Sequence, residues 1–192
     1  TVDTLNGIAT GAGQVDVVAG GALDVAHQVT NTGASDINLT GVGVDLSTAN
    51  SDVSSGSGNI TIDANTGNFN MFAGSTVITT LNDITISADT ASLAGQIQTP
   101  TATGDITIAA DPAATAINLG VGAAAGLALT DAELNTLEAN NVRIGTVAGA
   151  PYAGATTGAI TFVGAFAADA AFATDVFELR TTGAVADSAN VL

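Results

Sequence analysis

The sequence predicts an all-β protein, a right-handed parallel β-helix (β-solenoid) of about eight coils. Three observations predict it. Short apolar strands recur every 21 to 25 residues, and Gly, Asn, Asp and Ser separate them. The chain is 46% hydrophobic but only 4% aromatic, so its core must consist of small and branched aliphatic side chains. Fixed periods of 20 to 50 residues are typical of solenoids. The 192 residues are consistent with one domain, and we assign residues 1–192 to it.

One series of strands begins with Asp or Asn and continues apolar, polar, apolar. The first apolar positions are separated by 22, 23, 24 and 22 residues, which predicts one coil per step. In a strand, a period of two sends the apolar pair inward and the middle residue outward. The first apolar positions of this series are Val15, Ile37, Ile60, Ile84 and Ile106.

A second series, offset from the first, has steps of 21, 25, 24 and 24 residues. Two interleaved series with one period predict at least two strands per coil, on different faces. Each interior coil can bury its apolar residues only against its neighbours. The first apolar positions of this series are Leu23, Val44, Phe69, approximately Leu93, and Ile117.

A helical insertion is expected to interrupt the period of 21 to 25 residues. Thr130 and Glu133 have the spacing of a capping box, which predicts a helix over residues 131–139. Its apolar positions Leu134 and Leu137 should lie against the solenoid. Strands are expected to resume at residues 142–144, 160–162 and 177–179.

The charge of the chain excludes some partners. Two cations, Arg143 and Arg180, face 18 acidic residues, and the formal net charge is −16. Nucleic acids and anionic membranes are bound by clusters of Lys and Arg, so neither is expected as a partner. There is no cysteine, which excludes disulfides and thiolate metal sites. Gly, Asn, Thr or Pro breaks both long uncharged stretches, so membrane insertion is not expected.

The repeats resemble those of a known class of secreted protein. The units Asn59–Ile62, Asp83–Ile86 and Asp105–Ile108, with residues 129–134 and 142–162, look like repeats of filamentous-haemagglutinin-type exoproteins and giant repetitive bacterial adhesins. The resemblance covers residues 55 to 165. It implies a β-helical fold, export across the outer membrane, and a role in adhesion, biofilm or cell-surface structure.

Outward positions form two columns of polar residues. We interpret both as solvated ladders whose side chains bond along the column. The residues flanking the threonines do not repeat as an ice-binding face would require. The first column is Asp16, Asn38, Thr61, Thr85 and Thr107, and the second is Asp24, Asp45, Asn70 and Asn118.

No residue is assigned a catalytic or cofactor-binding role. Structural calcium is an alternative, because residues 56–63 distantly resemble a calcium-binding nonapeptide, but the ligands stay unknown. A polysaccharide lyase or hydrolase is the enzymatic alternative, and for a hydrolase two suitably separated carboxylates would be the minimum. His27, the one histidine, is expected at a surface or corner, and Met71 is expected to fill the core with Phe69.

The function expected from the sequence is therefore non-enzymatic. We expect an extracellular structural or adhesive module at a bacterial surface, either a segment of a longer protein or a filament subunit. Neither residues 1–14 nor residues 181–192 read as an amphipathic cap, so end-to-end or lateral self-association is expected. Other expected partners are a host or neighbouring cell surface and the extracellular matrix.

Overall fold

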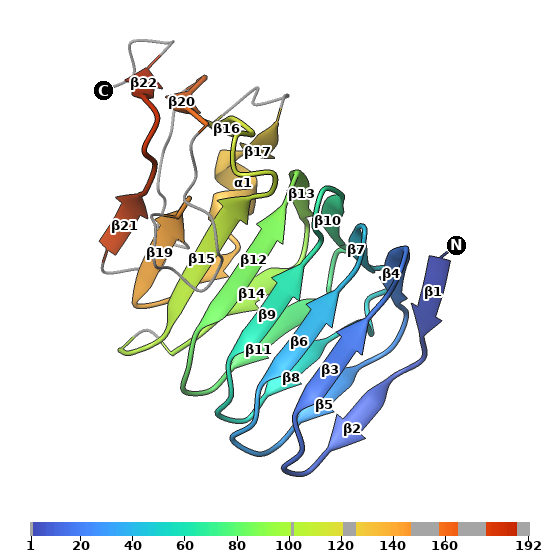
Figure 1. Ribbon diagram of the computed structural model, residues 1–192. Helices are drawn as coiled ribbons and strands as arrows, with labels where there is room; N and C mark the ends of the chain where they lie inside the picture. The colour runs from blue at the N-terminus through green and yellow to red at the C-terminus, as the bar shows by residue number, and fades with distance from the viewer. Residues whose placement is uncertain (1, 101, 121–125, 147–157, 165–175, 188–192) are drawn as a thin grey trace.

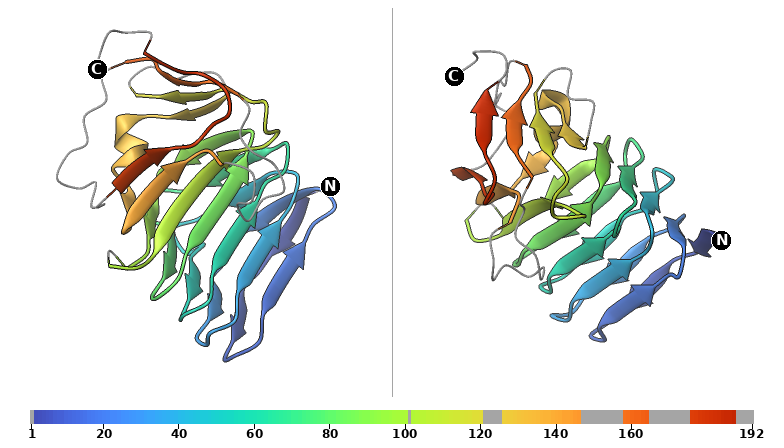
Figure 2. Two further views of the ribbon diagram at one scale, coloured as in Figure 1. Left: turned by 60° about the vertical axis from the view of Figure 1, so that its left-hand side comes forward. Right: turned by 45° about the horizontal axis from the view of Figure 1, so that its top comes forward.

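The computed structural model describes residues 2–100, 102–120, 126–146, 158–164 and 176–187. Over these residues the chain forms a parallel β-solenoid of about seven turns, with β1 at one end and β20 to β22 at the other (Figure 1). Figure 2 shows from two further directions that the coils stack along one axis. The predicted all-β parallel β-helix is confirmed.

Three parallel sheets form the faces of the solenoid, and a fourth lies at the far end. Face A contains β1 (Val2–Leu5), β4 (Ala22–Val25), β7 (Val44–Leu46), β10 (Asn68–Met71) and β13 (Thr90–Leu93). Face B contains β2 (Ile8–Thr10), β5 (Val29–Asn31), β8 (Val53–Ser55), β11 (Thr76–Thr79), β14 (Gln96–Gln98) and β18 (Leu137–Glu138). Face C contains β3 (Val15–Val18), β6 (Ile37–Thr40), β9 (Ile60–Asp63), β12 (Ile84–Ala88), β15 (Asp105–Ala110), β19 (Asn141–Ile144) and β21 (Val176–Leu179). The end sheet has the order β17 (Leu127–Leu129), β16 (Ile117–Leu119), β20 (Ile160–Phe162) and β22 (Val185–Asp187).

Face C is the first series of strands, in the predicted register. Ile37 lies beside Ile60, Ile60 beside Ile84, and Ile84 beside Ile106. These four isoleucines have no exposed surface. Equivalent residues of successive coils are therefore stacked directly upon one another, about 4.8 Å apart.

The Asp or Asn that precedes the first apolar residue of the interior face C strands connects successive coils. Asp36 Oδ1 accepts the Asn59 backbone N–H at 2.8 Å, and Asn59 Oδ1 accepts that of Asp83 at 3.3 Å. Asp83 Oδ1 in turn accepts the Asp105 N–H at 2.9 Å. Each of these three side chains thus bonds the backbone of the next coil, which explains why Asp and Asn, both short acceptors, recur at this position in the interior coils.

Face A contains the second series as far as Leu93, but the last member was assigned wrongly. Leu23 lies beside Val44, and Val44 beside Phe69. The strand of Ile117, β16, does not pair with β13; it lies between β17 and β20, and β17 is the strand that contacts β13. The 24-residue spacing from Leu93 to Ile117 matches the period. The strand that lies next to β13 is nevertheless β17, which contains Leu127, and Ile117 lies one strand further along.

Face B is a third sheet that the apolar pattern did not reveal. Its strands have one apolar inward residue followed by a small polar inward residue. Because only one of the two inward positions is apolar in most of these strands, the alternation that predicts faces A and C does not predict face B. The buried polar residues in this column are Asn31, Ser55, Thr79 and Thr99, each at most 2% exposed.

This inner polar column holds the turns between faces B and C. Asn31 Nδ2 donates to the Ser35 and Gly13 carbonyl oxygens at 2.6 and 3.1 Å, and Asn31 Oδ1 accepts the Gly33 N–H at 2.8 Å. In later coils, Ser55 Oγ accepts the Gly58 N–H at 2.9 Å. A buried backbone group requires a hydrogen-bond partner, and here the inner side chains supply it.

The turns also stack closely, which requires glycine at one position. A Cβ atom built on Gly58 would lie 2.0 Å from the carbonyl oxygen of Ser35 in the preceding coil. Backbone approach at this distance leaves no space for a side chain. The Gly-rich spacers therefore serve coil stacking as well as turning.

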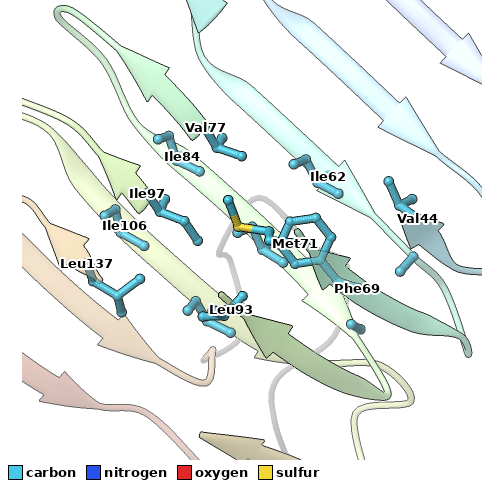
Figure 3. Packing of buried hydrophobic residues seen from close by; sticks show 14 of the residues in the cluster. Val44, Ile62, Phe69, Met71, Val77, Ile84, Leu93, Ile97, Ile106 and Leu137 are labelled. Atoms are coloured by element: carbon cyan, nitrogen blue, oxygen red, sulfur yellow. The ribbon is translucent and has the colours of Figure 1, made fainter. Parts of the chain in front are cut away.

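One continuous core fills the solenoid. Figure 3 shows side chains from all three faces pointing toward one another around Phe69 and Met71. These two are 0% and 3% exposed, so the predicted core role of Met71 beside Phe69 is confirmed.

The coil count and the helix differ from the sequence prediction. Face C has seven strands, and the register pairs Asp105 with Asn141 and Asn141 with Val176. These later steps are 36 and 35 residues long, so about seven turns form rather than eight.

The helix α1 spans only Asp131–Leu134, not residues 131–139. The Thr130–Glu133 capping box is present, and Leu134 and Leu137 are both fully buried as expected. Leu137, however, lies in β18 and pairs with Ile97. Strand pairing with β14 ends the helix after one turn.

Replacing Asn31 with leucine tests the inner polar column. The substitution keeps the number and branching of side-chain heavy atoms but leaves one buried N–H and two carbonyl oxygens without their partner, so we expect a loss of about 2 to 4 kcal/mol in the free energy of unfolding. Asn50→Leu, at an exposed turn position, is the control and should change stability by under about 0.5 kcal/mol. Urea unfolding measures both. Equal losses would contradict the structural role of the column.

Candidate functional site

The outward column of face C is only partly solvated. At its exposed end, Asn38 donates to Asp16 Oδ1 at 2.6 Å, and bonds from Asn38 and Gln14 lower the pKa of the Asp16 carboxyl. Further along, Thr85 and Thr107 are only 7% and 9% exposed. The prediction of a uniformly solvated ladder is wrong there, because strand alternation specifies which side a residue faces and not whether water reaches it.

Both arginines lie on face C in one ion-pair network. Arg143 pairs with Asp105, and its Nε lies 3.2 Å from Glu178 Oε2; Arg180 Nη2 lies 2.8 Å from the same Glu178 oxygen. Hydrogen bonding to Arg180 is the largest influence on Glu178 and lowers the pKa of its carboxyl. Both arginines are therefore paired with carboxylates of the same chain.

At the corner between faces C and A, the Asp111 carboxyl lies within reach of the charges of two other carboxylates. Asp63, Asp89 and Asp111 occupy successive coils, and burial raises the pKa of the Asp111 carboxyl, with the negative charges of Asp63 and Asp89 adding to the rise. Asp63 Oδ1 accepts the Asn65 N–H at 2.9 Å, and Thr115 donates to Asp89 Oδ1 at 3.0 Å. The charged form of the Asp111 carboxyl is therefore disfavoured in the folded chain.

The second predicted column lies on the outer side of face A and includes a groove. Asp24 and Asp45 are direct neighbours on β4 and β7, and Asn70 follows on β10. Asn70 Nδ2 donates to Asp45 Oδ1 at 2.5 Å, whereas Asp24 Oδ1 is shielded from solvent and has no hydrogen-bond donor among the described residues. Asn118 does not belong to this column, because its strand β16 is in the end sheet.

The groove has a volume of about 420 Å³ and mixes charged and apolar walls. Val2 and Phe72, which are 64% and 52% exposed, line it together with Asp24, Asp45 and Asn70. The volume lies in the range of small-ligand sites. Two carboxylates, an amide and an aromatic ring make it the best-defined candidate binding site among the described residues.

Residues in the segment that resembles a calcium-binding repeat make hydrogen bonds within the chain. In the 56–63 segment, Asn59 donates its N–H to Asp36, and Asp63 accepts from Asn65. Across the described part of the chain, no group of three or more His, Asp or Glu side chains is arranged to hold a metal ion. His27 is exposed at the turn between β4 and β5, as predicted.

Comparison with known proteins leaves the chain unassigned: no family model, no curated protein and no solved structure matches it. None of the helices in the described ranges is long and apolar enough to span a membrane.

The raised pKa of Asp111 predicts that Asp111→Asn increases the stability of the folded chain in a pH-dependent way. An acid whose pKa is raised by folding contributes stability below its unfolded value, about 3.9, and that contribution is lost as pH rises through the folded value. At pH 7 the asparagine variant should therefore melt at a higher temperature than the parent, and the difference should vanish near pH 3.

Asp3→Asn is the matched control, since it removes the same charge at an exposed position. The melting temperature of Asp3→Asn should rise less at pH 7. Thermal melts at both pH values measure the effect. Equal rises in melting temperature for Asp111→Asn and Asp3→Asn would contradict the effect of burial and neighbouring charges on Asp111.

Proposed function

We propose that this chain is a structural and adhesive solenoid module exposed outside a bacterial cell. The observation that carries the proposal is the in-register stacking of near-equivalent coils around one continuous core. Such a rod grows in length by adding coils without any change in its cross-section. Reach from a surface is the property that this architecture supplies most directly.

The surface charge supports the same proposal. Both cations are engaged on face C, while acidic side chains recur along the other faces and corners. A large net charge of one sign keeps proteins soluble and resists nonspecific association. A long rod with this surface would remain dispersed and present its faces to specific partners.

The first coil supports end-to-end addition. Each of β1, β2 and β3 pairs with one strand among the described residues, so its other edge is open. Val2 and Val18 are 64% and 79% exposed at this coil. An open edge pairs readily with another strand, here a further coil of a longer chain or a second copy.

Electron microscopy tests both parts of the proposal. Immunogold labelling of intact source cells with antibodies against the chain should mark the cell exterior, and labelling only after permeabilisation would refute the location. The purified chain should form fibres that Val18→Lys suppresses, because the charge and long side chain obstruct strand addition at the open edge.

Val42→Lys is the matched control for assembly. Val42 is also exposed, at 52%, but it lies in a turn of an interior coil between β6 and β7. Fibres should persist in this variant. Equal suppression by both substitutions, or a strictly monomeric parent chain, would contradict assembly through the first coil.

A further inference from the structure

We propose that both ends of the solenoid are surfaces for a second copy of this chain, and that an inward carboxylate at each end opposes their association until it is protonated. The inference rests on the end-to-end assembly proposed above and specifies how that assembly is controlled. Two residues carry it, Asp3 in β1 and Asp187 in β22, which lie at opposite ends of the stack (Figure 1).

Asp3 occupies a position that apolar core residues fill in the following coils. The register places Asp3 beside Leu23. Leu23 in turn lies beside Val44, and Val44 beside Phe69. Neighbouring residues in this register point to the same side of the sheet, and Leu23 is only 2% exposed. The Asp3 side chain therefore faces the inner side of the solenoid, and it is exposed at the open end of the first coil.

The far end repeats this arrangement. Ile160 and Phe162 of β20 point into the core, and β22 places Val185 beside the first and Asp187 beside the second. Asp187 thus has an inward position in the last described strand, where it is half-buried. In the strands that the structure describes, Asp3 and Asp187 are the only charged residues at inward positions. Charge is therefore confined to the two ends of the core.

A coil stacked on either end would bury one of these carboxylates. Equivalent positions inside the stack are shielded from water, as the 2% exposure of Leu23 and the 6% exposure of Phe162 show. An ionised carboxylate without a partner is strongly disfavoured in such a layer. Inward-pointing charges are one of the means by which β proteins prevent pairing at an open edge. The carboxylates should therefore oppose stacking at neutral pH.

A second copy cannot supply the missing positive charge. The chain has no lysine, and its two arginines form ion pairs with Asp105 and Glu178 on face C. Neutralisation of Asp3 and Asp187 in a joint between two copies must therefore come from protons.

Protonation removes the charge and leaves the attractive features of the end in place. In the first coil, Leu5, Ile8 and Val17 are only partly buried, so a further coil would cover them. An exposed aspartic acid titrates near about 3.9, and burial in an apolar layer raises that value. Association therefore takes up protons, and by linkage it strengthens as the pH falls.

Few neighbouring groups respond between pH 7 and about pH 5. β1 packs on β4, whose charged residue Asp24 faces outward, and β20 beside β22 has no charged residue. Asp16, in the same coil as Asp3, also faces outward. Exposed carboxylates stay largely ionised in this range, since they titrate near about 4. Histidine does titrate there, so His27, in the turn after β4, requires a control.

The test measures the critical concentration for fibre formation by the full chain at pH 7 and at about pH 5, by sedimentation and electron microscopy. For the parent it should fall at least about tenfold, because each unit by which burial raises a carboxyl's titration corresponds to a factor of ten in association. Asp3→Asn combined with Asp187→Asn should assemble at pH 7 as readily as the parent does at about pH 5. Circular dichroism should show the same β content throughout.

Two controls separate the inward carboxylates from the overall charge. Asp16→Asn combined with Asp83→Asn removes the same number of charges from exposed positions. This variant and His27→Gln should both retain the tenfold response to pH and should differ from the parent at pH 7 by less than about twofold.

Three outcomes would contradict the inference. Equal critical concentrations of the parent at both pH values would leave end-to-end assembly intact and overturn the role of Asp3 and Asp187. An equal fall at pH 7 for the control pair Asp16→Asn and Asp83→Asn would assign the effect to net charge. Absence of fibres from the parent and from the Asp3→Asn, Asp187→Asn variant at both pH values would overturn end-to-end assembly itself.

Discussion

In-register stacking of equivalent residues is the constraint on which the rest of the structure depends. Each inward isoleucine of face C lies on its counterpart in the next coil, and none of Ile37, Ile60, Ile84 and Ile106 has exposed surface. Backbone hydrogen bonds and apolar burial therefore arise from the same neighbours. A coil has little stability alone, and the period of the sequence has to match the circumference of the solenoid wherever the core is continuous.

The same stacking places equivalent outward side chains of successive coils side by side. Where the stacked side chains are acceptors beside backbone N–H groups, as at Asp36, Asn59 and Asp83, the ladder ties the coils together. Where they are carboxylates side by side, stacking brings like charges together. Asp24 beside Asp45 is the example on face A.

The sequence predicts the faces whose inward residues are both apolar, and it fails where they are not. Faces A and C were visible from alternation, whereas face B was hidden because Asn31, Ser55 and Thr79 point into the core. Leu137 follows Leu134 at helical spacing, which favours a helix, and only its pairing with Ile97 shows that it lies in a strand. The groove could not be predicted, because Val2 and Phe72 line one surface only after four coils have stacked.

Distances between spin labels along face B test the stacking most directly, since the chain has no cysteine of its own. The register leads from Ala9 through Thr30, Ser54, Ile78 and Gln98 to Glu138, one strand at each step. Labels on cysteines introduced at Ala9 and Gln98, then at Ala9 and Glu138, should lie about 19 and 24 Å apart in electron spin resonance measurements. A difference of about one strand spacing between the pairs is the predicted result. Equal mean distances, or a shorter one for the second pair, would contradict the solenoid.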